Sequence, residues 1–179
     1  MKLRILLLYF KMKYIPRFHC VKADRGQKIG LFIVLGLMFF LSSCGHGVLI
    51  DKSAPVHNAW FMNDPVVFDV TVNDTVHGYD FYLNLRHNNK YRYSNLYVFL
   101  QTEFPNHHVT RDTLQFILAA PSGKWLGKGW GKIKQDHILL KQNLRFPLKG
   151  RYQFSLWQGM RDDTLKGIED VGLQIERAQ

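Results

Sequence analysis

Hydrophobic and polar residues alternate with a period of two along most of the chain beyond residue 65. The clearest example lies near the C-terminus, where Val171, Leu173 and Ile175 are separated by Gly172 and Gln174. Such alternation places successive side chains on opposite faces of an extended strand, so that one face can be buried. The same period predicts strands over residues 66–70, 81–85, 96–100, 114–118, 138–140, 152–156 and 171–175.

Turn-forming residues separate these segments. Pairs or triplets that contain Asn, Asp, Pro or Gly occur at 63–65, 73–74, 87–89, 105–106, 121–123, 149–150 and 166–167. No helical period is sustained between them. Short strands at this spacing predict an all-β fold, an antiparallel β-sandwich. Jelly-roll and immunoglobulin-like connections both remain open.

Composition agrees with one folded domain. The chain has 179 residues, of which 46% are hydrophobic and 14% aromatic. Disordered proteins instead combine low hydrophobicity with high net charge. The two cysteines are too few for a disulfide scaffold or for a structural zinc site of the usual four-ligand kind.

The N-terminal segment has the features of a lipoprotein signal peptide. The apolar run Ile29–Leu41 has 13 residues, whereas a membrane-spanning helix needs about 20 and a signal-peptide core about 7–15. Ser42-Ser43 and Cys44 follow, in an order that resembles the bacterial lipobox. The resemblance implies that residues 1–43 are removed and that Cys44 carries the lipid. The alternative is a short anchor helix with an incidental cysteine.

The position of the lipobox sets the expected boundaries of the signal peptide, a tether and a folded domain. The 28 residues before Ile29 exceed the usual length of a signal peptide, so Met12 is an alternative start. Residues 44–58 contain scattered Gly, Ser, Pro and Asn without a period, and we expect a flexible, lipidated tether there. Residues 59–179 form the expected β-sandwich domain.

The positive charge of the chain belongs mostly to its N-terminal segment. The formal net charge is +10, but the first 43 residues hold eight of the 24 basic side chains and one acid, Asp24. Residues 44–179 therefore carry 16 basic and 13 acidic side chains. We expect no nucleic-acid partner for the mature protein.

The sequence lacks the usual catalytic motifs. It contains no G-x-S-x-G, H-E-x-x-H or P-loop pattern. Among the histidines after residue 44, only His107 and His108 cluster, and a solvated turn is favoured there because no further metal ligand can be placed beside them. We expect no enzymatic activity, no cofactor and no metal site.

Residues 123–132, GKWLGKGWGK, form the most unusual segment. Their four glycines disfavour a helix. In one interpretation, Lys124 and Lys128 act with Trp125 and Trp130 to bind a glycan, an anionic polymer or a partner protein. In the other, both tryptophans cover the end of the core from a glycine-kinked hairpin.

A second candidate cluster combines Arg86 with Tyr91, Arg92 and Tyr93. Tyrosine and arginine are enriched among the residues that dominate binding at protein interfaces. Aromatic residues are equally ordinary on strand faces, where cross-strand pairs stabilise a sheet. Both interpretations remain open.

Several motifs of this chain occur together in one known family. They lie in order at 93–97 (YSNLY), 111–114 (RDTL), 123–129 (GKWLGKG), 145–147 (RFP), 160–168 and 171–173. Over nearly all of residues 59–179 the chain resembles the gliding-motility lipoprotein family GldH of the Bacteroidota. The resemblance implies a role in gliding, linked to type IX protein secretion, and no enzymatic activity or cofactor.

We therefore expect a lipid-anchored envelope protein whose partners are other gliding and secretion proteins. The alternative is an envelope lipoprotein that binds a glycan or peptidoglycan. Position 45 is Gly rather than Asp, the residue that commonly retains lipoproteins in the inner membrane, and the next acid is Asp51. We expect the periplasmic face of the outer membrane as its location.

Overall fold

Strands make up the regular structure of residues 47–179, the part of the chain that the computed structural model describes. The expected signal peptide and Cys44 lie outside these residues. The strands are β1 (Val48–Pro55), β2 (Ala59–Phe61), β3 (Val66–Val72), β4 (Gly78–Asn88), β5 (Asn95–Glu103), β6 (Val109–Ile117), β7 (Ile133–Arg145), β8 (Gly150–Gln158), β9 (Thr164–Lys166) and β10 (Ile168–Arg177). No helix in this part of the chain is long and apolar enough to cross a membrane.

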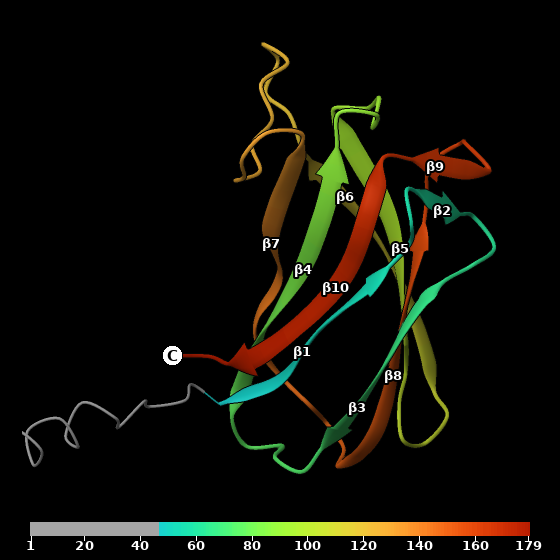
Figure 1. Ribbon diagram of the computed structural model, residues 1–179. Coiled ribbons are helices and arrows are strands. Elements are labelled where there is room, and N and C mark those ends of the chain that lie inside the picture. Colours follow the sequence, from blue (N-terminus) through green and yellow to red (C-terminus); the bar gives the residue numbers. More distant parts are fainter. Residues whose placement is uncertain (1–46) are drawn as a thin grey trace, which may run out of the picture. The chain divides into compact units, whose positions relative to one another are not determined.

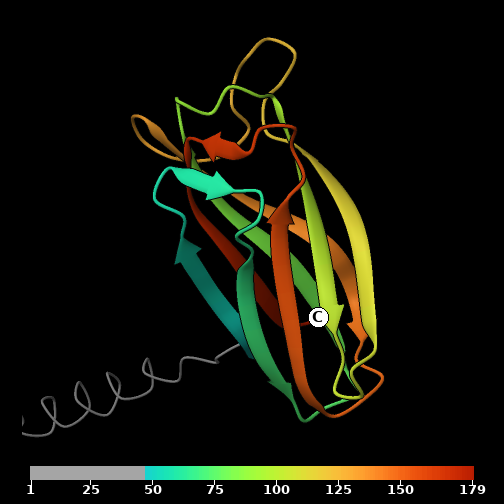
Figure 2. The same cartoon turned by 90° about the vertical axis from the view of Figure 1, so that its right-hand side faces the viewer.

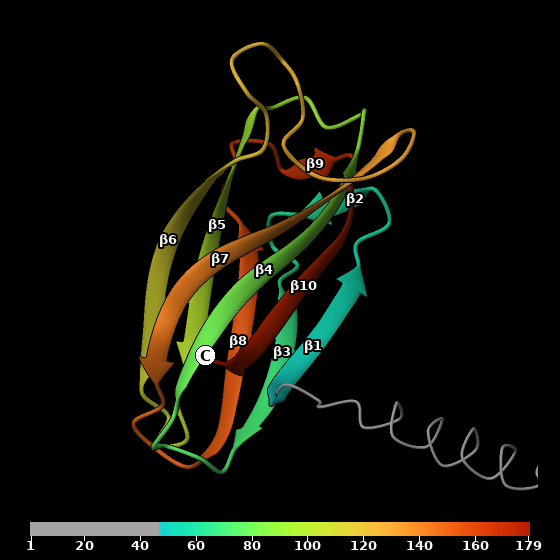
Figure 3. The same ribbon diagram turned by 90° about the vertical axis from the view of Figure 1, so that its left-hand side faces the viewer.

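Two antiparallel sheets of four strands pack face to face (Figures 1 and 3). Their strand orders are β1-β10-β4-β7 and β3-β8-β5-β6, and the short pair β2-β9 lies across one end (Figure 2). Each of the seven predicted segments lies in or directly beside a strand of these two sheets. The predicted antiparallel β-sandwich is confirmed.

The pairing of the strands is that of a jelly roll. β5 and β6 form a hairpin, and the other pairs nest around it: β4 with β7, β3 with β8, and β1 with β10. The chain thus runs as one long double strand that folds over into two sheets. This connection is a jelly roll rather than an immunoglobulin-like one.

Alternating side chains from both sheets fill the core. Leu83, Leu96 and Leu173 are fully buried, as the period of two predicts. Aromatic rings close one end of this core, where the ring centroids of Phe146 and Tyr152 lie 4.9 Å apart in an edge-to-face arrangement. Such a pair contributes about 0.5–1.5 kcal/mol beyond the burial of its area.

Strand β1 corrects the expectation of a flexible tether over residues 44–58. The strand begins at Val48 and pairs with β10 as far as Pro55. It was hidden in the sequence because it is an edge strand with one fully buried side chain, that of Ile50. Backbone pairing with β10, rather than hydrophobic alternation, accounts for the strand. Three residues, 45–47, therefore separate Cys44 from the sandwich.

The two ends of the sandwich carry different features. At the end that we call the Val48 end, β1 begins, β10 ends, and the connections 73–77, 104–108 and 146–149 turn. At the opposite end, which we call the Trp130 end, lie the connections 89–94, 118–132 and 159–163 and the β2-β9 pair (Figures 2 and 3). The first described residues and the long 118–132 connection therefore lie at opposite ends of the sandwich, a full strand length apart.

Candidate partner-binding site

The 118–132 connection is held by backbone hydrogen bonds in two successive turns. In the first turn, Leu126 N donates to Leu118 O at 2.8 Å. In the second, Lys128 and Gln135 exchange two backbone bonds of 2.8 and 2.7 Å. Gly131, inside the second turn, has a φ of 66°, a conformation that glycine adopts without the strain of a side chain. The connection is therefore an ordered projection, visible at the top of Figure 1.

Trp125 points back toward the core from this projection. Its ring lies 4.5 Å from that of His87 in an edge-to-face arrangement and 6.4 Å from that of Tyr91, centroid to centroid. The side chain is half-buried. This environment matches the second interpretation of the segment, in which Trp125 covers the end of the core.

Trp130 has the opposite environment. Its side chain is 98% exposed, and Leu126 on the same projection is 56% exposed. Lys124 and Lys128 are exposed as well. An aromatic side chain of this size buries about 150–250 Å² when a partner covers it. The packing function that the sequence allowed for both tryptophans therefore applies to Trp125 alone.

A buried ionisable pair supports the base of the projection. The side chain of His87 is fully buried, and its Nε2 lies 3.2 Å from Oδ2 of Asp136, which is 7% exposed, without the geometry of a hydrogen bond. A Cβ at Gly127 would come within 2.7 Å of that same oxygen, so a side chain at this position would require the Asp136 carboxylate to move. Neither His87 nor Asp136 is among the candidate residues that the sequence indicates. The period of two offered a signal for His87, since it continues the inward series of Phe81 and Leu85.

The tyrosines of the second cluster have structural hydrogen bonds. Tyr91 is buried, and its hydroxyl donates to Asn95 O at 2.6 Å. Burial raises the pKa of Tyr91 well above its usual range. The hydroxyl of Tyr93 donates to Asp162 Oδ2 at 2.9 Å, and this bond raises the pKa of Tyr93. Both side chains are therefore neutral donors at physiological pH.

Arg92 lies beside the same aspartate on the surface. Its Nη2 is 3.4 Å from Asp162 Oδ2, and its side chain is largely exposed. A surface groove of about 810 Å³ runs here. The groove is lined by Asn89, Lys90, Arg92, Tyr93 and residues 162–166.

The candidate residues thus fall into four groups. Trp125 contacts Tyr91 at the end of the core, while Arg92 and Tyr93 share Asp162 in the groove. Arg86 lies apart from the groove on β4, where its Nη1 is 2.8 Å from Asp170 Oδ2 on β10. Lys124, Lys128 and Trp130 stand on the projection.

The histidines of the described residues, 47–179, do not gather into a metal-binding group. Within residues 47–179, no three His, Cys, Asp or Glu side chains lie close enough together to hold a metal ion. His107 and His108 lie in the β5–β6 turn at the Val48 end, and His107 Nδ1 is 2.9 Å from Glu103 Oε1. Both histidines are exposed, as in the solvated turn that the sequence favoured.

Comparisons with known proteins agree on one family. The family model described as GldH lipoprotein matches residues 48–175. A gliding motility lipoprotein GldH homolog from Christiangramia forsetii is 35% identical over 155 residues, which cover 83% of this chain and 95% of that protein. The gliding motility lipoprotein GldH of Flavobacterium johnsoniae is 32% identical over 160 residues, which cover 86% of this chain and 98% of that protein. The chain therefore belongs to the GldH family of gliding motility lipoproteins.

Proposed function

We propose that this lipoprotein supports gliding motility, and the type IX secretion machinery linked to it, by binding partner proteins at its Trp130 end. The observation that carries the proposal is the fully exposed ring of Trp130 on an ordered, glycine-shaped projection. A tryptophan has only two side-chain torsions, and the backbone of the projection is already held by hydrogen bonds, so little conformational entropy is lost when a partner covers the ring.

The surroundings of Trp130 favour binding over catalysis. Lys124 and Lys128 lie on the same projection, and Arg92 lies in the nearby groove beside Asp162. Aromatic and arginine side chains dominate the binding energy of protein interfaces. Arg92 can exchange its exposed contact with Asp162 for an acidic group of a partner, because exposed ion pairs contribute little.

The second part of the proposal concerns the anchor. Cys44 receives the lipid, residues 1–43 are removed, and the domain faces the periplasm from the outer membrane. Gly45 stands in place of the Asp that commonly retains lipoproteins in the inner membrane. The sequence after Cys44 also lacks the acidic run that surface-exported lipoproteins often carry, which supports the periplasmic face. A tethered domain meets neighbouring membrane-linked proteins at a high effective concentration, so individually weak contacts suffice.

The test combines a deletion with a single-residue variant. Deleting the protein should block export of type IX cargo and, where the host glides, gliding as well. Trp130→Ala should reduce the capture of envelope proteins by cross-linking at least tenfold, as expected for a central aromatic contact. Val67→Ala is the matched control, since Val67 is exposed on β3 outside the projection. Normal cargo export in a clean deletion strain would contradict the proposal.

The same variants test the glycan alternative, which the exposed Trp130 ring among lysines also favours. Rings of this kind stack on sugars as well as on proteins. Binding to isolated peptidoglycan that Trp130→Ala abolishes, together with no captured protein, would replace the proposed protein partner by a glycan.

A further inference from the structure

We propose that the Val48 end of the sandwich is a membrane-contacting surface, which rests on an anionic phospholipid bilayer. The inference rests on the anchor at Cys44 in the proposed function. It goes beyond that function because it assigns a second surface, at the end of the domain opposite Trp130, with lipid headgroups as its ligand.

The chain that joins the domain to the anchor is short. Three residues lie between Cys44 and Val48, the first residue of β1. Fully extended, four peptide units span at most about 14 Å. The longest strands of the sandwich have 10–13 residues, which corresponds to a length on the order of 30–40 Å. The start of β1 is thus kept within a fraction of the domain's own length from the lipid.

The Val48 end also exposes large apolar side chains. Five of the eleven large hydrophobic side chains that are exposed within residues 47–179 lie here, in the connections or at the strand ends. They are Val48, Val76, Val109, Leu144 and Leu148. Val76 is 71% exposed, although it lies in a short turn beside a fully buried strand residue, Val72. Such side chains are stabilised by insertion among lipid headgroups.

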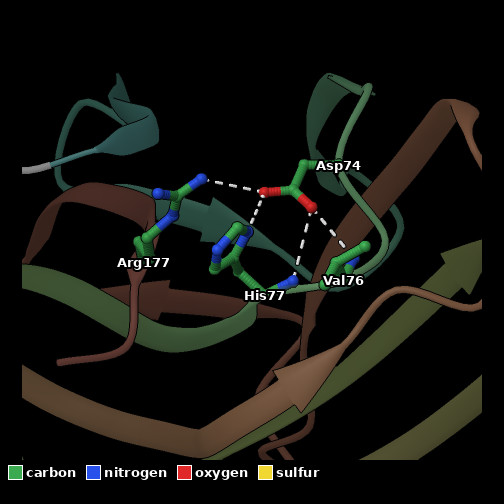
Figure 4. Close-up of polar contacts among 4 residues, drawn as sticks. All are labelled: Asp74, Val76, His77 and Arg177. Atoms are coloured by element: carbon green, nitrogen blue, oxygen red, sulfur yellow. Dashed lines mark hydrogen bonds and ion pairs between the residues drawn. The ribbon is translucent and has the colours of Figure 1, made fainter.

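The turn that carries Val76 is ordered (Figure 4). Val76 N donates to Asp74 Oδ1 at 2.9 Å, and Arg177 Nη2, at the end of β10, lies 2.9 Å from Asp74 Oδ2. His77 Nδ1 lies 2.6 Å from the same oxygen. These contacts fix the carboxylate from both sides, so Val76 is presented by a defined turn.

Basic side chains at the Val48 end also favour contact with an anionic bilayer. Asp74 forms an ion pair with Arg177, which offsets its charge, and Glu103 Oε1 lies 2.9 Å from His107 Nδ1. Arg145 precedes the 146–149 connection and Lys149 is its last residue. Both are exposed and make no ion pair within the described chain. A basic side chain near an anionic bilayer strengthens binding about fivefold, so the two together contribute roughly 25-fold at low salt.

The experiment measures the depth of each end in the membrane. The mature lipoprotein is inserted into vesicles of phosphatidylethanolamine and phosphatidylglycerol that contain spin-labelled lipid, with a fluorophore at Val76→Cys or Leu148→Cys. Ser122→Cys, in the exposed turn of the 118–132 projection, is the matched control. We expect strong quenching at 76 and 148 and none at 122. Equal quenching at both ends, or none at 76 and 148, would overturn the proposal.

A charge-reversal pair tests the electrostatic part. Arg145→Glu with Lys149→Glu should lower the ratio of quenched to unquenched fluorophore at 76 by roughly 25-fold or more in anionic vesicles. The same substitutions should have little effect in vesicles of phosphatidylcholine. Lys124→Glu with Lys128→Glu, which removes equal charge from the opposite end, is the control. An equal loss in both variants would overturn the assignment of this end.

Two further measurements separate this inference from the proposed function. Failure of the protein to float with the vesicles would overturn the anchor and the inference with it. Normal quenching together with normal partner capture in Trp130→Ala would leave the membrane surface standing and refute the proposed function. Absence of quenching at 76 and 148, together with partner capture that depends on Trp130, would refute the membrane surface and leave the proposed function standing.

Discussion

Two tryptophans on one short projection have opposite environments. Trp125 packs edge-to-face on His87, whereas the ring of Trp130 lies in solvent. They are five positions apart and are both flanked by glycine or lysine within two residues. The difference arises from the turn at Gly129 and Gly131, both with positive φ, which sends the second half of the projection away from the core.

This difference predicts unequal effects on stability. Trp125→Ala should lower the free energy of unfolding by about 2 kcal/mol, less than the cost of removing a fully buried aromatic side chain. Trp130→Ala should change it by less than about 0.5 kcal/mol, as for an ordinary surface substitution. Urea unfolding followed by circular dichroism measures both values. Similar losses for the two variants would mean that Trp130 also packs on the domain.

The hydrogen bonds of Asp74 make the stability of the fold depend on pH in the acidic range. Its hydrogen bond from Val76 N, followed by that from His77, holds the pKa of the Asp74 carboxyl well below its usual range. A carboxyl whose pKa is lower in the folded than in the unfolded state stabilises the fold above the unfolded pKa, about 3.9. This stabilisation is lost as the pH falls through the folded pKa.

Asp74→Asn should therefore lower the unfolding midpoint at neutral pH, and its deficit should shrink as the pH falls below about 4. Thermal unfolding across that pH range measures the effect. Asp112→Asn is the control, because Asp112 is exposed on β6 and makes no ion pair within the described residues. A deficit for Asp74→Asn that stays constant on acidification would contradict the assigned cause.

At the scale of strands, the period of two identified most of the core residues but not which strands pair with one another. The turn-forming residues 87–89 assign His87 to a turn, whereas the structure buries it within β4 in series with Leu83 and Leu85. The period also says nothing of Asp136 on β7. Pairing between β4 and β7 joins residues about 50 positions apart, and no local pattern specifies it. For the same reason the sequence predicted a β-sandwich but left the jelly roll open.

Strand β1 shows the other limit of sequence patterns. An edge strand can form with one buried side chain and a row of backbone hydrogen bonds to its neighbour. In β1 the buried side chain is that of Ile50, and the neighbour is β10. β1 lies close against Gly172 of β10, where an added Cβ would collide with Ser53 Oγ and lie 2.9 Å from Lys52 O. The sequence contained this glycine in the middle of its clearest strand without indicating that a neighbouring backbone required it.

Gly172→Val should therefore detach β1 from the sheet. We expect a loss of about 1–3 kcal/mol from overpacking and faster hydrogen exchange at the amides of residues 50–54, with little change in the β5–β6 hairpin. Gln174→Val, at the next position on the same face of β10, is the control for adding a β-branched side chain. Equal exchange in both variants would show that the close approach at Gly172 does not limit the pairing.

At the scale of the whole molecule, the jelly roll separates two surfaces. Its nested pairs bring the start of β1 and the end of β10 together at the Val48 end, while the 118–132 connection emerges at the opposite end (Figure 3). In the proposed arrangement, the bilayer and the partner therefore hold opposite ends of one rigid sandwich. The correction of the tether matters most here, because a tether as far as residue 58 would have left the domain free to turn.

The arrangement predicts that the length of the junction matters. Inserting about 20 Gly and Ser residues between His46 and Gly47 gives a flexible chain of roughly 25 Å r.m.s. end-to-end distance. Lipid anchoring should be unchanged, because the insertion follows Cys44, but quenching at Val76→Cys should fall severalfold as the effective concentration of the surface drops. Gliding, where the host glides, should weaken with it, since the partner-binding end is then no longer held at a fixed height. The same segment added after Gln179 controls for its composition. Unchanged quenching and gliding after the insertion would mean that the anchor needs only to retain the domain and does not orient it.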